Sequence, residues 1–116
     1  MKTNDIVSLY VSFVETGSGK KRPVLVRTID DKYVQAFKIT TKYHHKSPHI
    51  QRQYFHIHDW RQAGLYKESW VDIGQILNFP KIGLTFKTIG RLSDQDILNL
   101  DAFIKNFKLS SHKDEL

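Results

Sequence analysis

The sequence predicts a mainly β (α+β) fold: a small, strongly curved sheet or barrel of five to seven strands with one C-terminal α-helix packed on it. Two observations predict it. Short apolar runs suited to strands, separated by turn residues, recur from the N-terminus to about residue 89. Only the segment that follows residue 93 repeats its apolar residues with a helical period.

The first half of the chain predicts three strands. Apolar and polar residues alternate over residues 7–13, which is the period of a half-buried strand. Pro23 begins a β-branched run over residues 24–29, at the first position of a strand, where its missing N–H is tolerated. Residues 30–32 form a turn into a further strand over residues 33–39, so the second and third strands predict a hairpin.

The middle of the chain predicts a loop, a strand and a helical turn. Residues 42–51 are basic, histidine and turn residues and predict a mobile loop. Strand character resumes over residues 53–57. Asp59 is suited to begin a short helical turn that Gly64 ends, because Gly tolerates left-handed backbone angles.

The last third predicts two more strands and the helix. The strands are expected over residues 69–73 and 82–89, separated by a break at 78–80. Ser93 and Asp96 have the spacing of a capping box at the start of the helix. One helix face is then apolar: Ile97, Leu100, Phe103, Ile104 and Phe107.

A length of 116 residues, 40% of them apolar, suits one domain with one modest core. We expect this domain over residues 1–109 and a polar tail over 110–116. The tail ends in Lys113-Asp114-Glu115-Leu116, which spells the signal for retention in the endoplasmic reticulum. Because nothing else in the sequence directs the chain into the secretory route, we interpret this match as coincidental.

The chain carries 18 Lys and Arg against 12 Asp and Glu, a formal net charge of +6. This charge favours a polyanionic partner, nucleic acid first, with an acidic protein or a membrane surface as alternatives. The chain has no cysteine, which excludes a disulfide framework and a thiolate zinc site. No apolar stretch approaches the roughly 20 residues of a membrane span. We therefore expect a cytoplasmic protein with no membrane partner.

Five short motifs follow one another along the chain: residues 5–13, Gly19 to Val26 with its Arg-Pro pair, Ala36 to Thr41, Ser69 to Ile76, and Ile89 to Ser93. In this order and spacing they resemble the MazF/PemK family of type II toxin-antitoxin endoribonucleases, over roughly residues 5–107. Residues 42–64 depart from the family's pattern, so the resemblance does not extend to the RNA sequence that would be cut.

The resemblance implies an SH3-like barrel of the MazF/CcdB toxin type. It implies a ribosome-independent, metal-independent endoribonuclease that cleaves single-stranded RNA to a 2′,3′-cyclic phosphate and a 5′-OH. It also implies a homodimer, a cognate acidic antitoxin protein as partner, and no cofactor or metal.

The family's catalytic arginine and threonine match Arg22 and Thr40, with Thr41 as the second candidate threonine. A guanidinium donates two parallel hydrogen bonds to phosphate oxygens, and a threonine hydroxyl can donate to the same phosphate. Because a guanidinium hardly deprotonates in a protein, we expect Arg22 to act electrostatically. The proton shuttle is then Glu15 or a histidine from the loop that follows Thr41.

Two further groups of residues are candidates for RNA contacts. The predicted backbone contacts are Lys20, Lys21, Lys42, His44, His45 and Arg52. Five aromatic residues offer faces for unpaired bases, and we expect one or two of them to face RNA: Tyr43, Tyr54, Trp60, Tyr66 and Trp70.

The histidines leave other readings open. His56 and His58 would share one face of a strand, as metal ligands do, with Asp59 as the nearest carboxylate. A pair of histidines is also able to catalyse acid and base steps on RNA. Two other function classes remain as alternatives: a non-catalytic nucleic-acid-binding barrel, and a toxin that acts on a protein target such as DNA gyrase.

Overall fold

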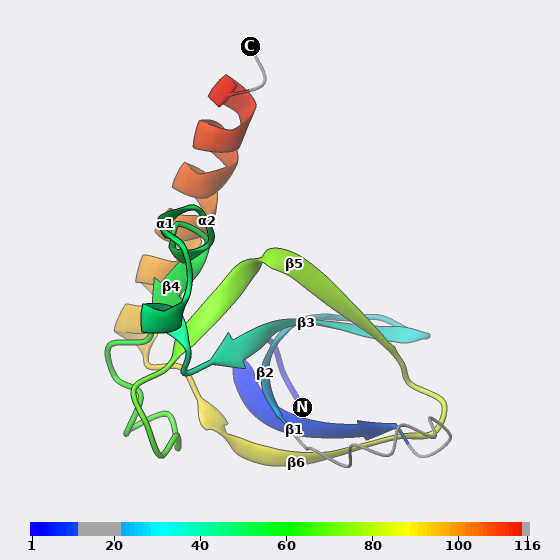
Figure 1. Ribbon diagram of the computed structural model, residues 1–116. Helices are drawn as coiled ribbons and strands as arrows, with labels where there is room; N and C mark the ends of the chain where they lie inside the picture. Colours follow the sequence, from blue (N-terminus) through cyan, green and yellow to red (C-terminus); the bar gives the residue numbers. More distant parts are fainter. Residues whose placement is uncertain (12–21, 115–116) are drawn as a thin grey trace.

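The computed structural model describes residues 1–11 and 22–114, with the backbone alone for residues 10–11 and 110–114. Its strands are β1 (Asp5–Val11), β2 (Pro23–Ile29), β3 (Tyr33–Thr40), β4 (Tyr54–His56), β5 (Trp70–Pro80) and β6 (Leu84–Arg91). Its helices are η1 (Tyr43–His45), α1 (Pro48–Gln51) and α2 (Asp94–Asp114) (Figure 1). The predicted Phe13 end of the first strand lies outside the described residues.

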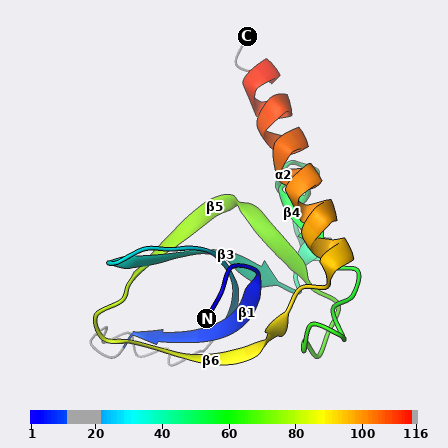
Figure 2. The same cartoon turned by 180° about the vertical axis from the view of Figure 1, so that it is seen from behind.

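The six strands form one antiparallel sheet in the order β4-β5-β3-β2-β1-β6. The sheet curls strongly, so that β3 and β5 lie across from β1 and β6 (Figure 1). From behind, α2 stands beside β4, and its C-terminal turns extend beyond the sheet (Figure 2). The prediction of a mainly β fold with a C-terminal helix is confirmed. Among the described residues the hydrogen-bonded order is open, with β4 and β6 at its edges, so the ladder does not close into a barrel.

The sheet separates two apolar clusters, because its inner strands bury side chains on both faces. The outer cluster packs against α2 and includes Ile6, Leu25, Ile39, Val71 and Leu100. The predicted apolar face of the helix packs here, and Phe103 meets Phe55 edge to face at 5.6 Å. The inner cluster fills the concave side of the sheet with Val7, Val24, Val26, Val34 and Ala36.

Strand β5 is longer than predicted and sharply bent (Figure 1). The predicted break at 78–80 was wrong, because Phe79 pairs with Val34 and packs on the inner cluster. Pro80 ends the strand, where a missing N–H is tolerated. The bend coincides with a bulge in β5. Phe37 of β3 pairs with Ile76, whereas the next residue of β3, Lys38, pairs with Asp72.

The predicted loop over residues 42–51 instead contains η1 and α1. Ser47 caps α1 by accepting a hydrogen bond from the N–H of Ile50 at 3.4 Å, and Pro48 occupies the first turn. This segment is therefore regular where an irregular one was expected.

The helical turn predicted after Asp59 is present. The N–H of Ala63 donates to the carbonyl of Asp59 at 3.0 Å, and Gly64 adopts a left-handed φ of 93°. The turn lies backbone to backbone on β6, where a Cβ on Gly90 would collide with the carbonyl oxygen of Ala63. Two glycines thus allow the segment after β4 to contact the end of β6.

We predict that Gly90→Ala destabilises the fold by about 3 kcal/mol, because the carbonyl of Ala63 cannot move aside as a flexible side chain can. The measurement is urea unfolding. Gly74→Ala is the matched control, since the added Cβ would meet only the amide end of Gln53, and displacing it costs about 1 kcal/mol. Equal losses from both variants would contradict this packing.

Candidate functional site

A pocket of about 880 Å³ opens where the ends of β2, β3 and β6 meet residues 64–69. Arg22 and Pro23 line it from the start of β2, Lys38 to Thr40 from the end of β3, and Lys87 to Ile89 from β6. The part of the wall that β2, β3 and β6 supply has its geometry fixed by the sheet, and the rest comes from the segments that flank β2 and β3 and from residues 64–69.

The pocket is strongly cationic. No Asp or Glu is among the described residues that line it. Its basic residues come from four separate parts of the chain: Arg22, Lys38, Lys42, Lys46, Lys67 and Lys87. None of the six forms an ion pair with any residue in the described part of the chain. Cations held close together without counter-charges raise the local concentration of an anionic ligand.

The register of β2 and β3 brings the two predicted catalytic residues together. Val24 lies opposite Lys38 in this antiparallel pair. The same register, continued by two residues, places Arg22 opposite Thr40. Both line the pocket, as does Thr41. A side chain from each strand end therefore reaches one site.

Thr40 is almost fully buried, with 9% of its surface exposed. Its Oγ1 accepts a hydrogen bond from the N–H of Lys42 at 3.1 Å. This contact fixes the hydroxyl oxygen, and the hydroxyl proton has no acceptor among the described residues. The hydroxyl is thus a positioned donor at the wall of a cationic pocket. Thr41 and Arg22 are exposed.

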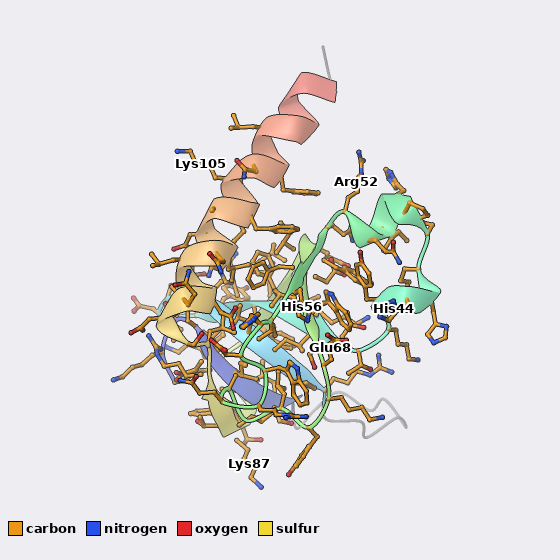
Figure 3. All side chains as sticks on the ribbon, turned by 90° about the vertical axis from the view of Figure 1, so that its left-hand side faces the viewer. His44, Arg52, His56, Glu68, Lys87 and Lys105 are labelled. Carbon is orange, nitrogen blue, oxygen red and sulfur yellow. The ribbon has the colours of Figure 1, made fainter. Side chains whose placement is uncertain are left out.

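The remaining predicted site residues fall into two groups. Glu15, Lys20 and Lys21 lie outside the described residues. His44, His45 and Arg52 do not line the pocket. Arg52 contacts Nδ1 of His49 at 3.3 Å, beside α1, and lies at the opposite side of the molecule from Lys87 in Figure 3.

No histidine in the described ranges lines the pocket, so the predicted histidine shuttle has no counterpart there. Its described lining residues supply hydroxyls, ammonium groups and one guanidinium, and no imidazole or carboxylate.

Four of the pocket's lysines were not predicted from the sequence. Lys38 could have been found, because it precedes Thr40 by two residues and therefore shares its face of the strand. No local sequence pattern marks Lys46, Lys67 and Lys87 as pocket residues. They follow η1, precede β5 and lie in β6, respectively, and only the folded chain brings these three places together.

An aromatic cluster lies on the same face of the sheet, next to Thr40. In register, Thr40 is opposite Trp70, which is opposite His56. Tyr43 stacks on Trp70 with ring centres 4.9 Å apart, and His44 and His56 contact the same indole. Trp70 is only 6% exposed, so the cluster supports the end of β3 rather than presenting an open face.

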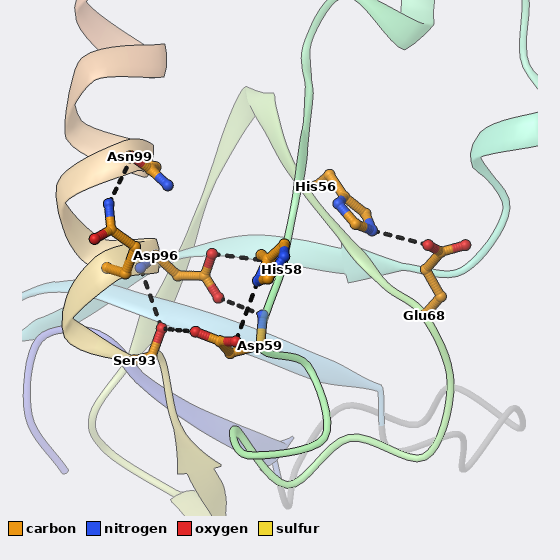
Figure 4. A network of polar contacts seen from close by, with 8 residues as sticks. His56, His58, Asp59, Glu68, Ser93, Asp96 and Asn99 are labelled. Atoms are coloured by element: carbon orange, nitrogen blue, oxygen red, sulfur yellow. Dashed lines mark hydrogen bonds and ion pairs between the residues drawn. The ribbon is translucent and has the colours of Figure 1, made fainter.

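The histidines of β4 and the next segment have separate partners (Figure 4). His56 pairs with Glu68 at 2.9 Å, and Nδ1 of His58 lies 3.2 Å from Asp59. The described residues contain no group of three or more His, Asp or Glu side chains arranged to hold a metal ion.

Asp96 connects α2 to the start of the loop between β4 and β5, whose residues 64–69 border the pocket. Its carboxylate is 0% exposed and accepts hydrogen bonds from the N–H groups of His58 and Asp59, at 3.1 and 2.8 Å (Figure 4). Ser93 Oγ caps the helix by accepting from the N–H of Asp96 and donates to the carboxylate of Asp59 at 2.7 Å. The hydrogen bonds from Ser93 and His58 lower the pKa of Asp59. The predicted cap by Ser93 is present, but the Asp96 side chain binds the segment after β4 and not the backbone at the start of α2.

Comparison with models of known protein families gives no match, and comparison with curated proteins gives none either. Among the described residues, no helix has the length and apolar character needed to cross a membrane.

We predict that Asp96→Ala destabilises the protein by about 3 kcal/mol, because the N–H groups of His58 and Asp59 both lose a charged acceptor that is fully buried. Urea unfolding measures the loss, and amide hydrogen exchange at residues 58 and 59 should accelerate. Asp94→Ala is the control: it removes the same charge from the same helix turn at an exposed position. Unchanged exchange in Asp96→Ala would contradict the anchoring role.

Asp59 gives a prediction for pH. Its folded pKa is lowered, so its contribution is complete above the ordinary value of 3.8 and is lost as pH falls through the lowered folded pKa. In urea unfolding, the free energy of unfolding of wild type should exceed that of Asp59→Asn by a margin that shrinks as the pH falls below that value. Asp30, whose pKa is also lowered, is present in both proteins and cancels. A margin independent of pH would refute this assignment.

Proposed function

We propose that this protein is a metal-independent endoribonuclease of the MazF/PemK toxin type, which cleaves single-stranded RNA to a 2′,3′-cyclic phosphate and a 5′-OH. One observation supports it above others: Arg22 and Thr40, the candidates drawn from the sequence, line one cationic pocket that no described acidic residue enters.

The arrangement suits transfer at phosphorus with the RNA 2′-OH as nucleophile. The guanidinium of Arg22 donates to the two non-bridging oxygens, where negative charge grows in the transition state. The hydroxyl of Thr40, whose oxygen already accepts a hydrogen bond from the N–H of Lys42, donates a hydrogen bond to the same phosphate. The surrounding lysines bind the flanking phosphates.

Proton transfer to and from the ribose oxygens needs a further group. Glu15, proposed from the sequence as this shuttle, follows β1 in the segment that joins it to β2. The role of Arg22 is electrostatic, because a guanidinium hardly deprotonates in a protein.

The same proposal includes an SH3-like toxin fold, a cytoplasmic location, a homodimer with RNA along its interface, and an acidic antitoxin. The antitoxin would compete with RNA for the pocket, because its six cations, which form no ion pair with a described residue, attract an acidic peptide as they attract phosphates.

A non-catalytic RNA-binding module is the second candidate. The observation that favours it is the lack, among the described lining residues, of an imidazole or carboxylate that could transfer the protons. Such a module would bind RNA through the same cations and leave it intact.

We predict that Arg22→Ala lowers the cleavage rate of a labelled single-stranded RNA by about 100- to 1,000-fold, with a much smaller loss of affinity. Thr40→Val should follow the same pattern. Lys105→Ala, an exposed cation on α2 far from Lys87 in Figure 3, removes the same charge and should cut at the wild-type rate.

Product ends should be 2′,3′-cyclic phosphate and 5′-OH, and a chelator should leave the rate unchanged. Binding without cutting by wild type would favour the RNA-binding module. Intact RNA with neither binding nor cutting would exclude both candidates and leave a protein target.

A further inference from the structure

We propose that Tyr66 is the residue on which an unpaired RNA base stacks, next to the phosphate held by Arg22 and Thr40. This inference rests on the proposed function and adds a contact with a base of the substrate. Tyr66 lines the pocket, yet it is 98% exposed. A single exposed aromatic residue is common on protein surfaces and would carry no inference alone. Tyr66, however, lines a cationic pocket, and the ligand of that pocket would lie next to its ring.

The chemistry of the pocket indicates which ligand this is. Lys67 follows Tyr66 directly and also lines the pocket, so a cation and an aromatic face are presented together. A single-stranded polynucleotide offers the complementary pair, a phosphate and a flat base one sugar away. An acidic peptide matches the cation but offers no flat group at each repeat.

The backbone around Tyr66 is held in place. The N–H of Gly64 donates to Arg61 at 3.1 Å, and the N–H of Leu65 donates to Trp60 at 3.0 Å. Leu65 packs against the outer apolar cluster. An aromatic ring with two side-chain torsions, presented from such a turn, loses little conformational entropy when a base stacks on it.

The other candidate aromatic residues are occupied. Trp70 is covered by Tyr43, and Tyr54 is buried. Trp60 is half-buried and has the Arg61 guanidinium 4.9 Å above its ring. Of the five aromatic residues considered, Tyr66 is thus the one with an open face at the pocket.

The test uses an RNA that wild type cuts, made uncleavable by a 2′-deoxy sugar at the mapped site and scanned with 2-aminopurine in place of each base. Wild type should quench the fluorescence at one position beside the cut. Tyr66→Ala should abolish this quenching and weaken binding roughly 5- to 100-fold, whereas Tyr66→Phe should keep both. An abasic nucleotide at that position should remove the difference between wild type and Tyr66→Ala.

Tyr33→Ala is the matched control, since Tyr33 is 46% exposed at the opposite end of β3 and should bind as wild type does. If wild type cuts RNA but Tyr66→Ala matches it in quenching and affinity, the inference is overturned and the proposed function stands. If wild type neither binds nor cuts RNA, the proposed function fails and this inference with it. Loss of binding to an acidic peptide, with RNA binding unchanged, would assign Tyr66 to a protein partner instead.

Discussion

Val24 and Lys38 lie opposite each other in the pair of β2 and β3, and the pocket depends on that register. The side-chain period of a strand is two, so a slip of one residue would turn Val24, Val26 and Ala36 away from the inner cluster. The same slip would move Arg22 and Thr40 out of alignment. Burial of a few small apolar side chains thus specifies the position of two polar ones, and no direct contact between Arg22 and Thr40 is needed.

The pocket works against the stability of the fold. Six cations approach one another without a counter-charge among the described residues, which raises their mutual repulsion. The surrounding structure offsets this with contacts that do not involve the pocket's charges. The glycine contact between Gly90 and Ala63 and the buried carboxylate of Asp96 hold one wall in place. A site that is unfavourable by itself and supported from outside is typical of a binding surface.

Local pattern predicted much of the fold and part of the site. The strands over residues 24–29 and 33–39 and the apolar face of α2 follow from periodicity, because neighbours in sequence determine it. The extension of β5 to Pro80 depends on the pairing of Phe79 with Val34, and this partner is distant in sequence. Lys67 and Lys87 likewise reach the pocket through tertiary packing alone. Arg22 and Thr40 could be selected because each stands at a strand end within a family-like motif.

Two parts of the site are held in place by different contacts. The groups proposed to bind phosphate stand at the ends of β2 and β3, whose register is fixed by the apolar clusters. Tyr66 stands on a loop that is fastened to α2 through Asp96 and to β6 through Gly90. Because these supports are separate, residues of the loop are able to change without disturbing the strand ends. On the proposed function, the groups that would bind the phosphate and the residue that would stack on a base are therefore held by separate parts of the fold.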